Sequence, residues 1–314
     1  MKRIVKETNY FTVYSIGEGI YAAIAKPGQG AWSNAGIVDL GDSVLIFDSF
    51  GTPTAGKELR RQAEDLTGKS VKYLVNSHYH GDHVFGNQAF KDLPIIATST
   101  TLRLCAERHK MGDVESEVKE MEDYLRTIQD KMSAANDQVI KQSLKNQYEE
   151  IAKLLEDLPR LEIVLPSLIF EDKKIIRGSE REVELICLGG GHTPSDTFMY
   201  IPDGKIAFMG DLLTEKLHLP IFDPAQLQII LRNVNELNIG TFVPGHGRVS
   251  DHSLSEALLD YLSFLIEEAK KAQERTEGLE DFLSRIELPE EYADWKGVNG
   301  IKANLVMAYH FYEM

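Results

Sequence analysis

Residues 76–90 read NSHYHGDHVFGNQAF and place three of the chain's nine histidines within six positions. His78, His80 and His83 share this segment with Asp82. Imidazole nitrogens and carboxylate oxygens are ligands for Zn²⁺ and similar divalent ions. The run VKYLVNSH is apolar and β-branched, which predicts a buried strand that ends near His78. Four donor side chains beyond a strand end suit two adjacent metal ions better than a single ion. The alternative interpretation of this segment is a solvated polar loop without metal.

Three further ligand candidates lie in the second half of the chain, each after a predicted strand. His192 follows EVELICLG, Asp211 follows KIAF and His246 follows TFVP. A single histidine after a strand is more often structural than a metal ligand. Ligands in α/β proteins nevertheless gather at strand ends. Together with residues 76–90, these positions predict a metal centre of five histidines and two aspartates.

The composition is that of an ordinary globular protein, with 43% hydrophobic and 26% charged residues among 314. A net charge of −15 disfavours polyanions, because binding them needs clustered Lys and Arg. We therefore expect a small-molecule substrate and no nucleic-acid partner. Cys105 and Cys187 lie in apolar runs and are predicted to be small buried side chains. The first 21 residues show no export segment and no stretch approaches ~18 apolar residues, which predicts a cytoplasmic protein without a membrane partner.

Strand and helix signals alternate along the chain and predict an α/β protein. Thr52, Pro53 and Gly68 predict the two ends of a helix between them. In residues 106–160, apolar side chains recur at spacings of three and four, which predicts an inserted helical hairpin. Ser253 and Glu256 predict a capping box at the start of a helical C-terminal extension, residues 251–314. We predict one domain over residues 1–314.

These motifs resemble a known family. The series His78-x-His80-x-Asp82-His83, Gly191-His192-Thr193, Gly210-Asp211 and Gly245-His246-Gly247 is similar to that of the metallo-β-lactamase superfamily over roughly residues 10–250. The resemblance implies a four-layer αβ/βα sandwich of two mixed sheets, with metals along one sheet edge. It further implies that three residues hold the first metal, three hold the second and Asp211 bridges both. The first set is His78, His80 and His192, and the second is Asp82, His83 and His246.

Two positions refine the resemblance. True β-lactamases of one branch carry a Cys at the second metal where this chain has Asp211, and iron-dependent redox relatives usually replace His80 with Glu. Two zinc ions per chain are therefore favoured, while Mn²⁺ or Fe²⁺ stays open because ligand type alone does not select the metal.

The predicted activity is a dinuclear zinc-dependent hydrolase that uses a metal-bridging hydroxide on a small carbonyl substrate: an ester, thioester, lactone or β-lactam. Asp82 is expected to orient the nucleophile and to transfer a proton as well as to bind metal. Five further residues are weaker candidates for contacts with the ligands or substrate, and each has a structural alternative as a cap, turn, loop or core residue. They are Asp48, Thr193, Lys216, His218 and Trp32.

Two other functions are consistent with the sequence. The same dimetal centre suits a phosphodiesterase or nuclease similar to the tRNA 3′-processing members, although the chain lacks a basic stripe. A non-catalytic, metal-stabilised binding scaffold is the third possibility. Apolar neighbours such as Leu154 would remain partly exposed on a freestanding hairpin, and an apolar strip of this kind usually covers another surface. This predicts a substrate-facing lid that also contributes to a homodimer.

Overall fold

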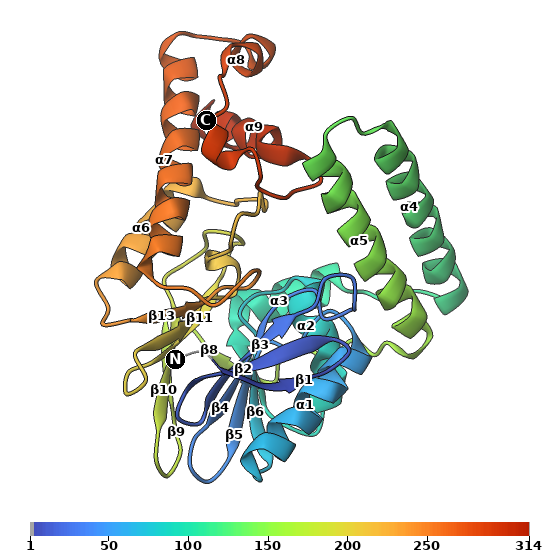
Figure 1. The fold of residues 1–314 in the computed structure, drawn as a ribbon, viewed down its shortest axis with the longest axis vertical. Helices are drawn as coiled ribbons and strands as arrows, with labels where there is room; N and C mark the ends of the chain where they lie inside the picture. The colour runs from blue at the N-terminus through green and yellow to red at the C-terminus, as the bar shows by residue number, and fades with distance from the viewer. Residues whose placement is uncertain (1–2, 314) are drawn as a thin grey trace.

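The computed structural model describes residues 3–313 and contains two mixed β-sheets packed face to face, with helices on the outer faces (Figure 1). The predicted αβ/βα sandwich is confirmed. The helical hairpin stands beside one end of the sandwich, and the C-terminal helices rise from the same end (Figure 1).

The first sheet has eight strands in the order in which they occur along the chain. Its first five strands pair antiparallel, and the last three continue in parallel pairing from β5. The strands are β1 Arg3–Glu7, β2 Phe11–Gly17, β3 Ile20–Ala25, β4 Ala35–Asp39, β5 Val44–Phe47, β6 Val71–Val75, β7 Ile95–Thr98 and β8 Leu168–Phe170.

The second sheet has five strands in the order β13-β12-β11-β10-β9. Its pairs are antiparallel except β12 with β13, which run parallel. The strands are β9 Lys173–Arg177, β10 Glu182–Cys187, β11 Thr197–Ile201, β12 Ile206–Phe208 and β13 Thr241–Val243.

Seven α-helices of the described residues lie in the sandwich and the C-terminal extension. They are α1 Pro53–Thr67, α2 Gly81–Val84, α3 Ser99–Arg108, α6 Pro224–Asn235, α7 His252–Glu274, α8 Leu279–Arg285 and α9 Gly300–Glu313, and the 3₁₀ turn η1 Phe85–Phe90 follows α2. Three shorter 3₁₀ turns are η2 Leu158–Arg160, η3 Gly210–Leu212 and η4 Glu290–Tyr292.

Alternating side chains explain the layers, because successive residues of a strand point to opposite sheet faces. One core lies between the sheets, where Leu45 and Phe47 of β5 meet Met199 and Phe208 of the second sheet. Val44 and Ile46 of β5 instead contact α1, while β11 and β13 pack on α6 and α7.

The predicted ends of α1 are confirmed. Thr52 accepts a hydrogen bond from the Ala55 amide, Pro53 opens the helix and Gly68 ends it at φ 68°. The predicted capping box at Ser253 is wrong. Asp251 caps α7 instead, two residues earlier than expected, because its carboxylate accepts from the Ser253 amide. Cys105 is buried as predicted, while Cys187 is half-buried.

The predicted hairpin consists of α4 Val114–Ala134 and α5 Gln138–Asp157. Its core, built around Leu125, Ile128 and Ile151, also includes Trp32 and Val298 from distant segments. Leu154, which a freestanding hairpin would leave partly exposed, is buried at 7% exposure. The chain itself covers this part of the hairpin.

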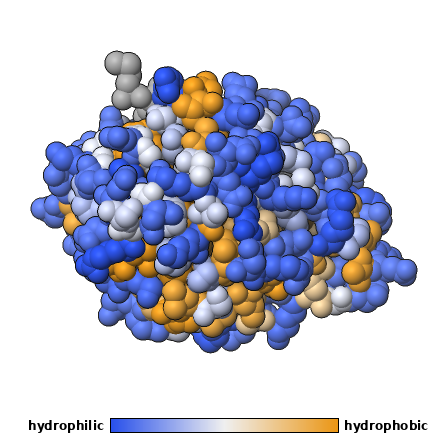
Figure 2. Space-filling view, turned by 90° about the horizontal axis from the view of Figure 1, so that it is seen from below, coloured by the Kyte–Doolittle hydropathy of each residue, from blue (hydrophilic) through white to orange (hydrophobic). Residues whose placement is uncertain are grey.

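Outside the cores, hydrophilic side chains dominate the face seen in Figure 2, and apolar side chains gather along one edge of it. Within the described part of the chain, no helix is both long and apolar enough to cross a membrane.

Candidate metal centre

The seven predicted metal ligands converge at one end of the sandwich. His78 and His80 follow β6, and Asp82 and His83 lie in the short helix α2 immediately after them. The other three residues come from the β10–β11 loop, from η3 after β12 and from the segment after β13; they are His192, Asp211 and His246. Strand ends from both sheets thus bring together side chains up to 168 positions apart in the sequence.

The donor atoms form two groups, each lying within 4.8 Å. In the first group, His80 Nδ1 lies 3.0 Å from His78 Nε2 and 3.0 Å from His192 Nε2. Asp211 completes this group, with Oδ2 3.4 Å from His192 Nε2.

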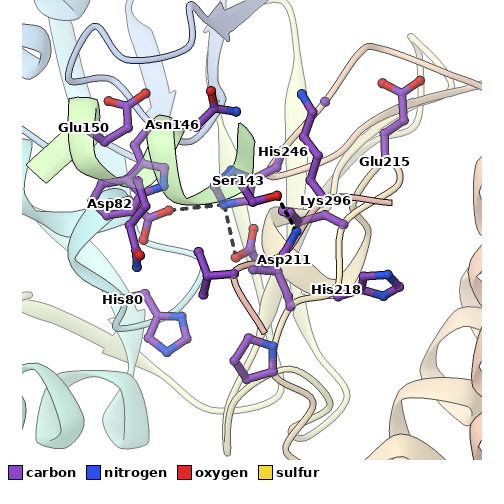
Figure 3. Close-up of a pocket in the computed structure, with 18 of the residues that line it drawn as sticks. His80, Asp82, Ser143, Asn146, Glu150, Asp211, Glu215, His218, His246 and Lys296 are labelled. Atoms are coloured by element: carbon purple, nitrogen blue, oxygen red, sulfur yellow. Dashed lines mark hydrogen bonds and ion pairs between the residues drawn. The ribbon is translucent and has the colours of Figure 1, made fainter. Parts of the chain in front are cut away.

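The second group contains Asp82, His83 and His246. Asp82 Oδ2 lies 3.2 Å from His246 Nε2 and 3.5 Å from His83 Nε2. Asp211 faces this group as well, since its Oδ1 lies 3.3 Å from His83 Nε2 and its Oδ2 3.4 Å from His246 Nε2. The Asp211 carboxylate therefore lies between the groups; Figure 3 shows it beside Asp82 and His246.

The buried carboxylate of Asp48 orients ligands of both groups. Its Oδ2 lies 2.8 Å from His83 Nδ1 and accepts from Ser77 Oγ at 2.8 Å, while its Oδ1 accepts from the Ser77 amide at 2.7 Å. Because the Ser77 hydroxyl donates to Asp48, it accepts from His78 Nδ1 at 2.9 Å. With their Nδ1 atoms donating, His78 and His83 turn the lone pairs of Nε2 toward the centre.

His192 is oriented in the same manner by the backbone. Its Nδ1 donates to the Pro220 carbonyl at 2.7 Å, which leaves Nε2 as the acceptor. The Asp196 carboxylate accepts from the amides of Gly191, His192 and Thr193 and fixes the loop that carries the imidazole. In His78, His83 and His192, the nitrogen that faces the centre is thus set by a partner of the opposite ring nitrogen.

These side chains fit a pair of metal ions. Among residues 3–313, His83 Nε2 and Asp211 Oδ1 are buried without a hydrogen-bond partner, although they lie 3.3 Å apart. Ligands about 2.0–2.2 Å from a tetrahedral ion are themselves roughly 3.3–3.6 Å apart. Buried polar atoms without partners are costly, and a cation between them would satisfy both.

The electrostatics also favour cations. Burial opposes a charge on His246, yet the carboxylates of Asp211 and Asp82 raise its pKa to about 10. Burial likewise opposes ionisation of Asp82, but His83 and His246 lower its pKa to about 2. In the first group, burial and the neighbouring imidazole of His192 lower the pKa of His80 to about 4, which keeps its lone pair available.

A local backbone requirement accompanies the ligand positions. A Cβ atom on Gly245 would overlap Asp211 Oδ1, so only glycine allows the segment before His246 to pass beside the carboxylate. Asp48 adopts φ 61°, a conformation that is uncommon for residues other than glycine and is concentrated at functional sites.

A sequence profile described as the metallo-beta-lactamase superfamily matches residues 32–259. The chain belongs to the metallo-beta-lactamase superfamily. The match covers all seven candidate ligands but ends within α7, so α8 and α9 lie outside it.

Solved structures with this fold include a metallo-beta-lactamase from Pontibacter korlensis, with a TM-score of 0.54 and 17% identity over 84% of this chain and 99% of that one. A stereoselective inverting sec-alkylsulfatase from a Pseudomonas species has a TM-score of 0.66 and 14% identity over 96% of this chain. A double mutant of a sec-alkylsulfatase has a TM-score of 0.67 and 15% sequence identity. The chain spans 50% of each alkylsulfatase, and at these identities the likeness shows the fold alone.

In this superfamily member, the ligand groups open into a cavity of about 1270 Å³. Of the seven, His80, Asp82, His192, Asp211 and His246 line it. Its walls come from residues 24–34, 80–85, 143–154, 215–220 and 294–307. The hairpin contributes through α5, and Figure 3 shows Glu150 and Asn146 of this helix near the top of the view and Ser143 near its centre, above Asp211.

Of the weaker candidates, three line this cavity. Trp32 lies in its wall and also packs on the hairpin core, so both predicted environments apply. Lys216 is paired with Asp294 at 2.5 Å. His218 lies 2.9 Å from the Tyr261 hydroxyl, and burial lowers its pKa to about 4, which makes it a neutral wall residue.

Thr193 has the alternative role, shaping a turn. Its hydroxyl donates to Asp196 at 2.7 Å, within the loop that positions His192.

Sequence reasoning missed the polar contacts that hold α5 over the cavity. Ser143 Oγ accepts from the Gly297 amide at 2.9 Å, and Glu150 accepts from the amides of Gly28 and Gly30 at 2.6 and 2.7 Å. Asp157 accepts from the amide and hydroxyl of Thr54 at 2.9 and 2.7 Å. The available signal was their spacing of seven residues, each directly before a buried aliphatic residue: Leu144, Ile151 and Leu158.

Proposed function

We propose that the protein is a dinuclear zinc-dependent hydrolase of carbonyl substrates, namely esters, thioesters, lactones or β-lactams. The observation that supports this most strongly is the position of Asp211, whose two carboxylate oxygens face both ligand groups at the end of an open cavity. The site contains no cysteine, in contrast to closed structural zinc sites, which are typically Cys-rich. This favours catalysis over a structural scaffold.

The residues have distinct roles in this proposal. One cation would be held by His78, His80 and His192 and the other by Asp82, His83 and His246, and Asp211 would contribute to both. When bound, two such cations polarise a carbonyl oxygen and acidify nearby water.

The protein's own side chains prepare the reaction. Asp48 and the Pro220 carbonyl orient the imidazoles before substrate binds. Asp82 lines the cavity, where its carboxylate orients the attacking water, accepts its proton and delivers it to the leaving group. Helix α5 and residues 294–307 cover the reacting group and limit its exposure to bulk water.

A phosphodiester substrate is less consistent with the charges around the cavity. Two of the three Lys and Arg side chains that line it are already ion-paired, Lys216 with Asp294 and Arg248 with Glu215, and the net charge is −15. Lys and Arg groups commonly contribute to phosphate recognition. A carbonyl substrate does not need them.

The proposal is tested with zinc-loaded protein and a panel containing aryl esters, a thioester, a lactone, a chromogenic lactam, bis(p-nitrophenyl) phosphate and a sec-alkyl sulfate. Elemental analysis should give two zinc ions per chain. We expect turnover of at least one carbonyl substrate, its loss on chelation and its recovery with zinc. Faster cleavage of the phosphodiester or the sulfate would replace the proposed substrate class, and inactivity towards the whole panel would contradict the hydrolase.

A further inference from the structure

Helix α9 presents apolar side chains in two directions. One set, Ile301, Leu305 and Ala308, is buried in the core that α9 shares with α7. The other set, Ala303, Val306 and Met307, is half-buried and lines the cavity above the metal centre. A helix on a protein surface normally needs a single apolar stripe, so the second one is available to an occupant of the cavity.

Apolar residues beside a metal-ligand candidate line the same cavity as the α9 side chains. His192 donates to the Pro220 carbonyl at 2.7 Å, and both Pro220 and Leu219 line this cavity. The first ligand group and Met307 therefore share one cavity. The side chains that α9 directs into it, Ala303, Asn304, Val306 and Met307, carry no charge.

Hydrogen bonds hold the α9 wall of the cavity in place. Asn304 donates to the Tyr261 hydroxyl at 3.0 Å, and Tyr261 in turn lies 2.9 Å from His218 Nδ1. The segment before α9 is paired with the loop beside the site, because the Lys296 amide donates to the Lys216 carbonyl at 2.9 Å and the His218 amide to the Lys296 carbonyl at 2.7 Å. The apolar side chains are thus presented by a fixed element.

The cavity is also larger than the reacting group alone requires. Its volume of about 1270 Å³ exceeds the ~300–1,000 Å³ that is typical of pockets for drug-sized ligands. An ester or lactam group at the metal centre would leave most of this space, including the α9 wall, to the remainder of the substrate.

We propose that the Val306–Met307 face of α9 binds an aliphatic chain of the substrate, so that the substrate is an amphiphile with its hydrolysable group at the metal centre. The position of that group rests on the proposed function, whereas the α9 wall rests on the cavity lining. Helix α9 lies outside residues 32–259, so the superfamily match does not itself supply this binding site.

The first test measures binding without turnover. Calorimetry with zinc-loaded protein compares decanoate with acetate, which has the same carboxylate but no chain. We expect decanoate to bind at least tenfold more tightly. Met307→Gln introduces a side chain of similar size that is polar. It should weaken decanoate binding at least fivefold and leave the affinity for acetate within twofold of the wild-type value. Lys302→Gln on the exposed side of α9 is the matched control and should change neither.

The second test measures turnover of p-nitrophenyl acetate, butyrate and hexanoate. Burial of each methylene at about 0.8 kcal/mol corresponds to a roughly fourfold gain in kcat/KM. We expect this gain in the wild type and a much smaller one in Met307→Gln, with unchanged zinc content.

The outcomes separate the two proposals. If no ester is cleaved but decanoate binding depends on Met307, the chain-binding site stands and the proposed reaction fails. If esters are cleaved at rates independent of chain length, and decanoate binds no more tightly than acetate, the reaction stands and the α9 site is refuted. Equal decanoate affinity in wild type and Met307→Gln would also refute it.

Discussion

The Asp48→Asn substitution tests whether one buried carboxylate controls the metal affinity of both ligand groups. Asp48 is 1% exposed, and its two oxygens accept hydrogen bonds from the Ser77 amide, the Ser77 hydroxyl and His83 Nδ1. Asparagine has nearly the same shape but replaces one acceptor with an NH₂ donor. In one orientation this NH₂ faces His83 Nδ1–H, and in the other it faces the Ser77 amide. Each leaves two donors in contact.

The magnitude follows from that conflict. A buried donor without an acceptor costs about 1–3 kcal/mol. In the first orientation, His83 can escape only by moving its proton to Nε2, the nitrogen that faces the second ligand group, where it would block metal binding. We therefore expect zinc affinity to fall about 10- to 100-fold, which is the usual effect of losing such a partner and equals about 1.4–2.8 kcal/mol. The second group should be affected most, because His83 contacts Asp48 directly.

Competition titration with a chromophoric zinc chelator measures this loss, and circular dichroism verifies the fold. Asp92→Asn is the matched control, since Asp92 forms an exposed ion pair with Arg60 at 2.5 Å. Its zinc affinity should remain that of the wild type. Zinc affinities within twofold of wild type in Asp48→Asn would refute the reasoning about His83.

Four other predictions concern separate parts of the molecule. Asp211→Ala removes the carboxylate between the ligand groups and should lose most of the second metal by elemental analysis, whereas Asp203→Ala in an exposed turn should retain two equivalents. In metal-free protein, burial raises the pKa of Glu150 to about 7, above an unfolded value of about 4.3. The folded state therefore retains the proton longer, and the stability of wild type relative to Glu150→Gln should fall by roughly 3 kcal/mol from pH 5 to pH 8 in urea titrations; a constant difference would contradict this. The predicted homodimer through the hairpin remains to be tested, and Tyr124→Glu on the exposed side of α4 should reduce the mass measured by light scattering to that of a monomer. Thr276 adopts φ 54°, so Thr276→Gly should stabilise the protein by about 0.5–1 kcal/mol in urea unfolding, and no gain would show that this backbone is unstrained.

The sequence was sufficient for features whose determinants are close together in the chain. His78, His80, Asp82 and His83 occur within six positions, so their proximity requires little beyond a strand end. The hairpin could be recognised from the helical spacing of its apolar residues, and α1 from its capping residues. His192, Asp211 and His246 were identifiable because each follows a predicted strand, and strand ends meet at a sheet edge.

The tertiary structure alone decided which surfaces enclose the cavity. Glu150 reaches the amides of Gly28 and Gly30 across about 120 positions, and its sequence context resembles that of any charged residue on an amphipathic helix. Helix α9 poses the same difficulty. The spacing of its apolar residues identifies the face that packs in the core, but it does not show whether a side chain on another face, such as that of Met307, points to solvent or into a cavity. A freestanding hairpin would leave Leu154 partly exposed, and packing against distant segments buries it. Local patterns follow from backbone geometry within a few residues, but the contacts that shape the cavity depend on how separately formed elements pack.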